Sequence, residues 1–262
     1  MSIVTNNDLP LLIVGVECLL NPSFEDWVSG TPTGWTKGGS VSEEAAFTFP
    51  TGARSANMGN GATLSQAMSL SLMGLTTFPA WADAFVCVAC TRGGNGSIQI
   101  SGGSSAGMNN VSGKWALCYA QHSATGTVTI TGGPGGTYVD SVMVGFAIDL
   151  SVPATKWNPV PKLKGEKRES PYMVVTQMVC DAWDLKATLA PFDATLKAKI
   201  LGAITYMQRG HYFGMILDRL NSGPYMDEVL PYLYWDSQDS PTFTSGAPDV
   251  FGMNFNGRGC LP

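Results

Sequence analysis

The chain has few side chains of the kinds that perform catalysis. Its two histidines, His122 and His211, stand apart, one near the end of an expected strand and the other after an expected helix. Carboxylates stand close together at Asp227-Glu228 and again at Asp236 and Asp239. Such pairs cleave glycosidic bonds only when they face one another across a cleft, which spacing alone does not indicate. The sequence has no Gly-x-Ser-x-Gly elbow, no phosphate-binding glycine loop and no His-Glu-x-x-His. We therefore expect no catalytic residues and no enzyme.

Six cysteines are candidates for disulfides or a metal site: Cys18, Cys87, Cys90, Cys118, Cys180 and Cys260. Cys87 and Cys90 lie in an apolar, strand-like run, where an odd spacing directs them to opposite faces. No second Cys-x-x-Cys is present to complete a zinc cage. We therefore expect reduced, packed thiols in a protein made in a cytoplasm, with disulfides in an exported protein as the alternative.

Composition limits the classes of partner. Of the 262 residues only 13% are charged, the formal net charge is −5, and 31 glycines indicate many turns. This charge provides no basic surface for nucleic acid or an anionic membrane. The apolar run at 11–16 is short and follows no basic residue, so we expect neither a secretory signal nor a transmembrane helix.

The composition changes once, at about residue 150. Before it, short alternating runs separated by glycine-rich turns are typical of β-strands. Residues 151–171 are rich in proline and charge, which indicates an extended, solvated linker.

Helical spacing follows the linker. Apolar residues between 175 and 189 recur at three and four residues, and Asp193 can cap a second helix over 196–207. The final segment, 236–262, has aromatic residues without a period. We expect it to be an extended arm that docks on a neighbouring subunit, because exposed aromatic rings are costly.

The stretch Leu19-Leu-Asn-Pro-Ser-Phe-Glu-Asp-Trp27, followed by Gly34-Trp35, resembles the first strand of galactose-binding-like jelly rolls, the fold of many carbohydrate-binding modules. Later segments follow in the order expected for that family: Arg54–Gly59, Thr63–Ser69, Gly113–Trp115, Thr127–Thr131 and Tyr138–Val142. The resemblance covers about residues 17–150. It implies a two-sheet β-sandwich with Phe24 and Trp35 in its core.

The resemblance implies two kinds of site. In many relatives the carboxylates at the positions of Glu25 and Asp140 help to hold a structural calcium ion, which takes six to eight oxygen ligands. The alternative is that both carboxylates only cap turns. Glycan-binding relatives use exposed aromatic rings, and the candidates here are Trp27, Trp81 and Tyr119.

The expected fold is mainly β with a smaller helical part: an N-terminal arm (1–16), a jelly roll (17–150), a linker (151–171), a mostly helical anchoring domain (172–235) and an extended C-terminal arm (236–262). Such jelly rolls are also common on bacteriophage particles. We therefore expect a structural protein of a tailed bacteriophage virion, a capsid-decoration, collar or tail-associated subunit made in the host cytoplasm. Its expected partners are other virion proteins and copies of itself. The alternative is a glycan-binding module that attaches to a host surface or a polysaccharide.

Overall fold

The computed structural model describes residues 11–16, 18–48, 52–73, 77–101, 105–107, 115–150, 154–170, 173–207, 212–216, 233–235, 242–247 and 250–260. These residues are mainly in β-strands, with one α-helix among them. The β-rich fold predicted from the sequence is therefore confirmed.

The strands of the first half are β1 (Leu11–Val16), β2 (Trp27–Val28), β3 (Thr31–Pro32), β4 (Thr36–Gly38), β5 (Val41–Glu44), β6 (Ser55–Met58), β7 (Thr63–Ala67), β8 (Ala84–Gly93), β9 (Ser97–Ile100), β10 (Ser105–Gly107), β11 (Trp115–His122), β12 (Thr127–Thr131) and β13 (Thr137–Asp149). A 3-10 turn covers Leu70–Met73. The second half contains β14 (Ala154–Ser170), β15 (Met173–Phe192), α1 (Ala194–Met207), β16 (Tyr212–Ile216), β17 (Leu233–Trp235), β18 (Thr242–Ala247) and β19 (Val250–Cys260).

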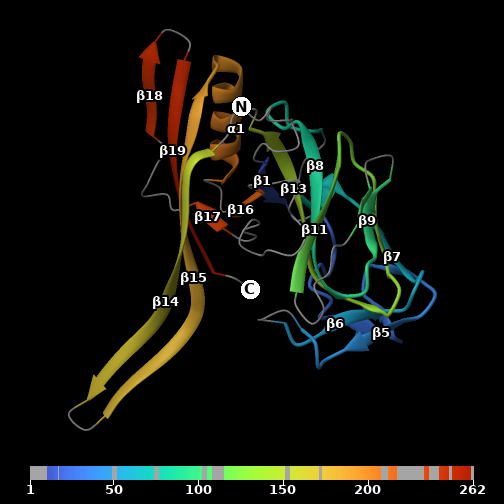
Figure 1. The fold of residues 1–262 in the computed structure, drawn as a ribbon. Coiled ribbons are helices and arrows are strands. Elements are labelled where there is room, and N and C mark those ends of the chain that lie inside the picture. The colour runs from blue at the N-terminus through green and yellow to red at the C-terminus, as the bar shows by residue number, and fades with distance from the viewer. Residues whose placement is uncertain are drawn as a thin grey trace.

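The first half is a β-sandwich (Figure 1). One sheet has the order β10-β9-β12-β7-β4, and the strands β11, β8, β13, β6 and β5 face it from the larger sheet. Alternate residues of both sheets meet in one core, for example Ile98 and Ile130 from the first sheet and Phe85 and Val139 from the second. Phe24 and Trp35 pack there with ring centroids 5.1 Å apart, so the prediction that both are core residues is confirmed.

Strand β1 joins the two halves of the chain. It pairs antiparallel with β13 on one side and with β16 on the other, so the larger sheet continues as β1-β16-β17-β19-β15-β14. Residues 11–14 are almost fully buried. The structure thus differs from the N-terminal arm expected over 1–16, at least for residues 11–16. An uninterrupted apolar run suits a central strand that is covered on both faces.

The second half differs from the helical domain that its apolar spacing indicated. Residues 175–189 lie in strand β15, the expected linker forms β14, and much of the expected C-terminal arm forms β18 and β19. β15 pairs with β14 along its length and with β19 from Ala182 onward. Short apolar runs fit either period, and here pairing with distant strands decides the conformation.

The second predicted helix is confirmed as α1, together with its N-cap. The side chain of Asp193 accepts a hydrogen bond from the backbone N–H of Leu196 at 2.8 Å. α1 packs on the sandwich through Gly202, which lies against the Trp81 ring, and through an ion pair between Lys199 and Asp83. In the part of the chain that the structure describes, no helix is long and apolar enough to cross a membrane.

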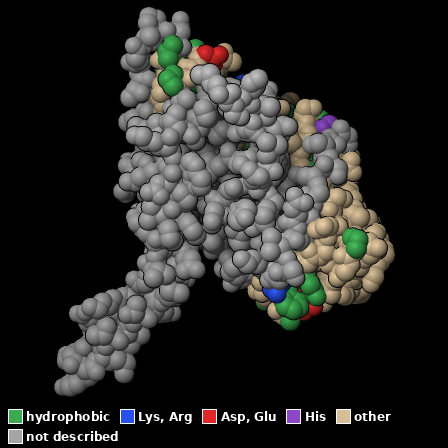
Figure 2. Space-filling view, viewed as in Figure 1, with side chains coloured by type: hydrophobic (Ala, Val, Ile, Leu, Met, Phe, Trp, Pro, Cys, Tyr) green, Lys and Arg blue, Asp and Glu red, His purple; other side chains and the backbone are tan. Residues whose placement is uncertain are grey.

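The surface of the sandwich reflects the low charge of the sequence. Figure 2 shows mostly uncharged polar side chains and backbone on the visible part of the sandwich, with basic, acidic and apolar groups side by side at the end where β5 and β6 lie.

Candidate cation site and ligand-binding face

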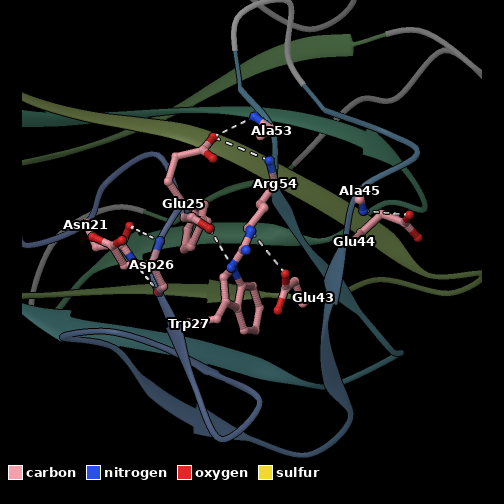
Figure 3. Close-up of polar contacts among 10 residues, drawn as sticks. Asn21, Glu25, Asp26, Trp27, Glu43, Glu44, Ala45, Ala53 and Arg54 are labelled. Atoms are coloured by element: carbon pink, nitrogen blue, oxygen red, sulfur yellow. Dashed lines mark hydrogen bonds and ion pairs between the residues drawn. The ribbon is translucent and has the colours of Figure 1, made fainter.

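The position of Glu25 is determined by the opening loop of the sandwich, which hydrogen bonds between Asn21 and Asp26 hold closed. The Asn21 side chain donates to the carbonyl of Asp26 at 2.8 Å and accepts from the N–H of the same residue at 3.1 Å (Figure 3). Within this loop Phe24 has a φ of 56°, a left-handed conformation that costs on the order of 1–3 kcal/mol in a non-glycine residue. The Asn-Pro dipeptide and the strained Phe24 therefore direct the next residue, Glu25, away from the core.

Asp140 is positioned by a β-bulge. The register between β13 and β8 shifts between Asp140 and Val142, and the intervening Ser141 has a φ of 49°. Bulges change the direction of a neighbouring side chain. Asp140 is only 1% exposed, and its Oδ1 accepts the N–H of Ser141 at 2.7 Å. Backbone strain thus flanks both of the predicted carboxylates.

The two carboxylates meet at Gly52. A Cβ built on that glycine would lie 2.8 Å from Glu25 Oε1 and 3.2 Å from Asp140 Oδ2, so these two oxygens are at most 6 Å apart. Glu25 Oε1 also accepts the backbone N–H groups of Ala53 at 3.0 Å and Arg54 at 3.4 Å (Figure 3). The structure therefore brings together both residues predicted for the calcium site, at a glycine where a Cβ would displace the Glu25 carboxylate.

These residues fit a hard cation, and they also make the hydrogen bonds of turn caps. Two carboxylates in close approach, one of them buried, favour a positive charge between them, whereas the Arg54 side chain pairs with Glu43 at 3.2 Å. Among the described residues no group of three or more acidic, histidine or cysteine side chains is suited to a metal ion. Further ligands would have to be backbone carbonyls or water, which calcium accepts.

A row of polar and aromatic residues crosses the outer face of the larger sheet. Asn57 is the register partner of Tyr138, and Tyr138 is the partner of Arg92. Their neighbours Ala56, Met58 and Val139 are buried in the core, so strand alternation places the row on the opposite face, where its members are partly exposed. By register the row continues to Ser42 on β5 and to the position of Trp115 on β11. We call these five positions the outer-face row.

Phe47 completes this surface. Its ring centroid lies 4.9 Å from that of Tyr138, and the Arg92 guanidinium carbon lies 4.5 Å from the Phe47 ring. The Phe47 carbonyl accepts from the Ser55 hydroxyl at 2.6 Å, which ties it to β6. The result is two aromatic rings and a planar cation held beside an amide side chain, an arrangement typical of ligand sites with few, well-placed polar groups.

The outer-face row lies next to the carboxylates. Tyr138 and Asp140 are two residues apart on β13, a separation of about 6.6 Å along a strand. Any group held by Glu25 and Asp140 would therefore border the row directly.

Two of the three aromatic residues predicted for glycan binding, Trp27 and Trp81, pack against other parts of the protein. The Trp27 indole N–H donates to the Phe24 carbonyl at 2.5 Å, and the ring packs against the sandwich core. Trp81 lies between the sandwich and α1, with its ring centroid 5.5 Å from Phe146 and 5.7 Å from Tyr206. The side chain of Tyr119 lies outside the described side chains.

Sequence reasoning missed the outer-face row for a topological reason. The alternation in Tyr138-Val139-Asp140 predicts that Tyr138 and Asp140 share the face of the strand opposite the core-facing Val139. It does not show that β6 and β8 are the strands on either side of β13.

No protein-family model and no curated protein sequence matches this chain. Among solved structures it is similar to the CBM22-1 and GH10 modules of an endo-1,4-β-D-xylanase from Clostridium thermocellum complexed with xylohexaose, at 14% identity and a TM-score of 0.31 over 53% of this chain and 28% of that one. It is also similar to the C-terminal family 22 carbohydrate-binding module of the same enzyme, at 15% identity and a TM-score of 0.28 over 47% of this chain and 89% of that one. The chain thus spans little more than a quarter of the first structure.

Proposed function

We propose that the N-terminal sandwich is a glycan-binding module and that a sugar chain binds on the outer-face row. The observation that carries this proposal is the cluster of Phe47, Tyr138, Arg92 and Asn57 on one partly exposed sheet face. Sugar rings offer apolar C–H faces that pack on aromatic rings. Their neighbouring hydroxyl groups accept from a guanidinium and exchange hydrogen bonds with an amide.

Removal of the Arg92 guanidinium tests this site. Hydrogen bonds to charged groups contribute about 1.5–3 kcal/mol, so Arg92→Gln should weaken binding by about tenfold or more. The assay is affinity gel electrophoresis of the full chain in gels that contain soluble xylan, mixed-linkage β-glucan, galactomannan or pectin, followed by calorimetry with the polysaccharide that retards it.

Lys37→Gln is the matched control, because Lys37 is an exposed cation on β4 of the other sheet and donates to the Gly30 carbonyl. It removes the same charge without touching the outer-face row. The proposal requires retardation by at least one polysaccharide, loss of it in Arg92→Gln and its retention in Lys37→Gln. Equal effects of the two variants would place binding elsewhere.

We also propose that Glu25 and Asp140 hold a structural calcium ion beside this face. The ion would neutralise the two carboxylates and fix the backbone at Gly52 between β13 and the opening loop. A ligand that binds only the folded state stabilises it by mass action, by about 2.7 kcal/mol at a concentration 100 times its dissociation constant. The melting temperature of the full chain should therefore rise with calcium and fall with EDTA.

Asp140→Asn should abolish that response to calcium, whereas Asp26→Asn, an exposed change next to Glu25 in the opening loop, should keep it. A melt that is the same with calcium and with EDTA would leave Glu25 and Asp140 as turn caps.

A second candidate function is that of a structural subunit of a bacteriophage particle. One observation favours assembly of some kind: the long hairpin of β14 and β15 projects away from the sandwich (Figure 1). Electron microscopy of the source particle, with labelling by antibodies against this chain, tests the candidate. Absence of the chain from purified particles would exclude it.

A further inference from the structure

Among the residues that the structure describes, the β14–β15 hairpin has two open backbone edges. β14 is the last strand of the larger sheet, and β15 pairs with β19 only from Ala182 to Phe192. From Met173 to Asp181, β15 is therefore paired on its β14 side alone, within the part of the chain that the structure describes. Figure 1 shows this part of the hairpin extending beyond the rest of the sheet. A ribbon of two strands is only marginally stable in water without a third strand or a covering layer.

The two edges differ in sequence. β14 has five basic residues, at 156, 162, 164, 167 and 168, and prolines at 159 and 161. Lysine and proline on an edge strand discourage pairing with another chain. β15 has neither charge nor proline from Met173 to Cys180, where it reads MVVTQMVC. An uncharged, β-branched edge of this kind favours the addition of a strand.

We infer that the open edge of β15 pairs with the same edge of a second copy of this chain. Antiparallel pairing about a two-fold axis near Gln177 would join residues 173–181 of both copies into a four-stranded sheet in the order β14, β15, β15, β14. Such a contact is self-complementary, because each edge supplies the donors and acceptors that the other lacks.

The charges select this arrangement over other pairings. β14 carries five basic residues and two glutamates, a net charge of +3, so two β14 edges would repel one another. With both β15 strands between them, the β14 strands lie about 14 Å apart, given a strand spacing of about 4.8 Å. This exceeds the screening length of about 8 Å at physiological ionic strength. The uncharged edges, in contrast, meet without any like-charge contact.

A competing arrangement would dock the basic β14 on the sandwich of another copy. Residues 11–150 contain eight acidic and four basic residues, a net charge of −4. That contact would depend on β14 charges and weaken with salt, whereas pairing of the β15 edges depends on neither. The two arrangements are therefore distinguishable by experiment.

The test is a charge exchange at Gln177 in the full chain, measured by sedimentation velocity over a concentration series. Like charges opposite one another on paired strands destabilise the pair by up to about 1 kcal/mol. Gln177→Lys and Gln177→Glu should each raise the dimer dissociation constant by about fivefold. An equimolar mixture of the two variants should form a heterodimer at least as tight as the wild-type dimer.

Lys164→Glu on β14 is the control and should leave the dimer unchanged, and the thermal melts of all variants show whether they fold. A wild-type chain that stays monomeric at 100 µM would overturn the inference. So would a dimer that is insensitive to both Gln177 variants, or one that is lost in Lys164→Glu or in high salt. None of these outcomes depends on whether the sandwich binds a glycan.

Discussion

Substitution of Gly202 tests the packing of α1 on the sandwich. On helix propensity alone, Gly202→Ala should stabilise the protein by about 1 kcal/mol, because glycine is the poorest ordinary residue in a helix interior. The structure predicts the opposite sign. A Cβ at position 202 would lie 2.7 Å from three atoms of Trp81, its Cβ, Cγ and Cδ1.

Trp81 cannot easily withdraw from that contact. Its Cβ is next to the backbone of a turn in which the Ala82 N–H donates to the Pro79 carbonyl at 3.1 Å and the Asp83 N–H donates to the Ala147 carbonyl at 2.8 Å. Overpacking of this kind costs about 1–3 kcal/mol. The clash therefore outweighs the gain in propensity, and the expected net loss is about 1 kcal/mol. For a chain of this size that corresponds to a melting temperature about 2–4 °C lower.

The assay is thermal unfolding followed by circular dichroism, for Gly202→Ala alone and in a Trp81→Gly background, which removes all three of these atoms. In that background the clash is relieved, so the same substitution should become neutral or stabilising, and the difference is the coupling energy of the pair. Thr195→Ala, on an exposed position of α1, serves as the control for helix propensity. If Gly202→Ala raises the melting temperature in the wild-type background, α1 does not pack on Trp81 as described.

Three further predictions concern the N-cap of α1 and the cysteines. Asp193→Ala should lower the stability by about 1 kcal/mol because the N-cap of α1 is lost, whereas Asp193→Ser should keep most of it, as measured by urea denaturation. Burial raises the pKa of the Cys18 thiol from 9.0 to about 12, so the neutral thiol is favoured in the native state. The contribution of this pKa shift to the free energy of unfolding, up to about 4 kcal/mol for three pKa units, is present below pH 9 and lost as the pH rises toward 12. The free energy of unfolding of the wild type should therefore fall more steeply over this range than that of Cys18→Ala. Cys18 and Cys87 are both buried in the core, and alkylation under denaturing, non-reducing conditions should label all six cysteines. A stable bridge found by mass spectrometry would contradict the expectation of cytoplasmic synthesis.

The sequence was sufficient to predict features that depend on interactions between residues close together in the chain. The Asp193 cap could be read directly, because the N-cap bond joins residues three apart. The core positions of Phe24 and Trp35 could be inferred from the motif of the opening loop, in which the Trp35 indole donates to the Asn21 carbonyl at 3.1 Å. In β12 the alternation of Val128 and Ile130 with threonines likewise indicates one buried face, and both residues are fully buried.

Only the tertiary structure decided features that depend on which segments become neighbours. Residues 175–189 fit a helix by spacing, yet they form a strand because β14 and β19 supply backbone partners. Trp81 is an aromatic residue of the type that binds sugar rings. However, α1, over a hundred residues later in the chain, packs against it at Gly202. Asn57, Tyr138 and Arg92 belong to three separate strands that lie side by side only through the order of the sheet. The order of the strands depends on burial and hydrogen bonding between segments that are far apart in the sequence. Short sequence patterns therefore do not predict it.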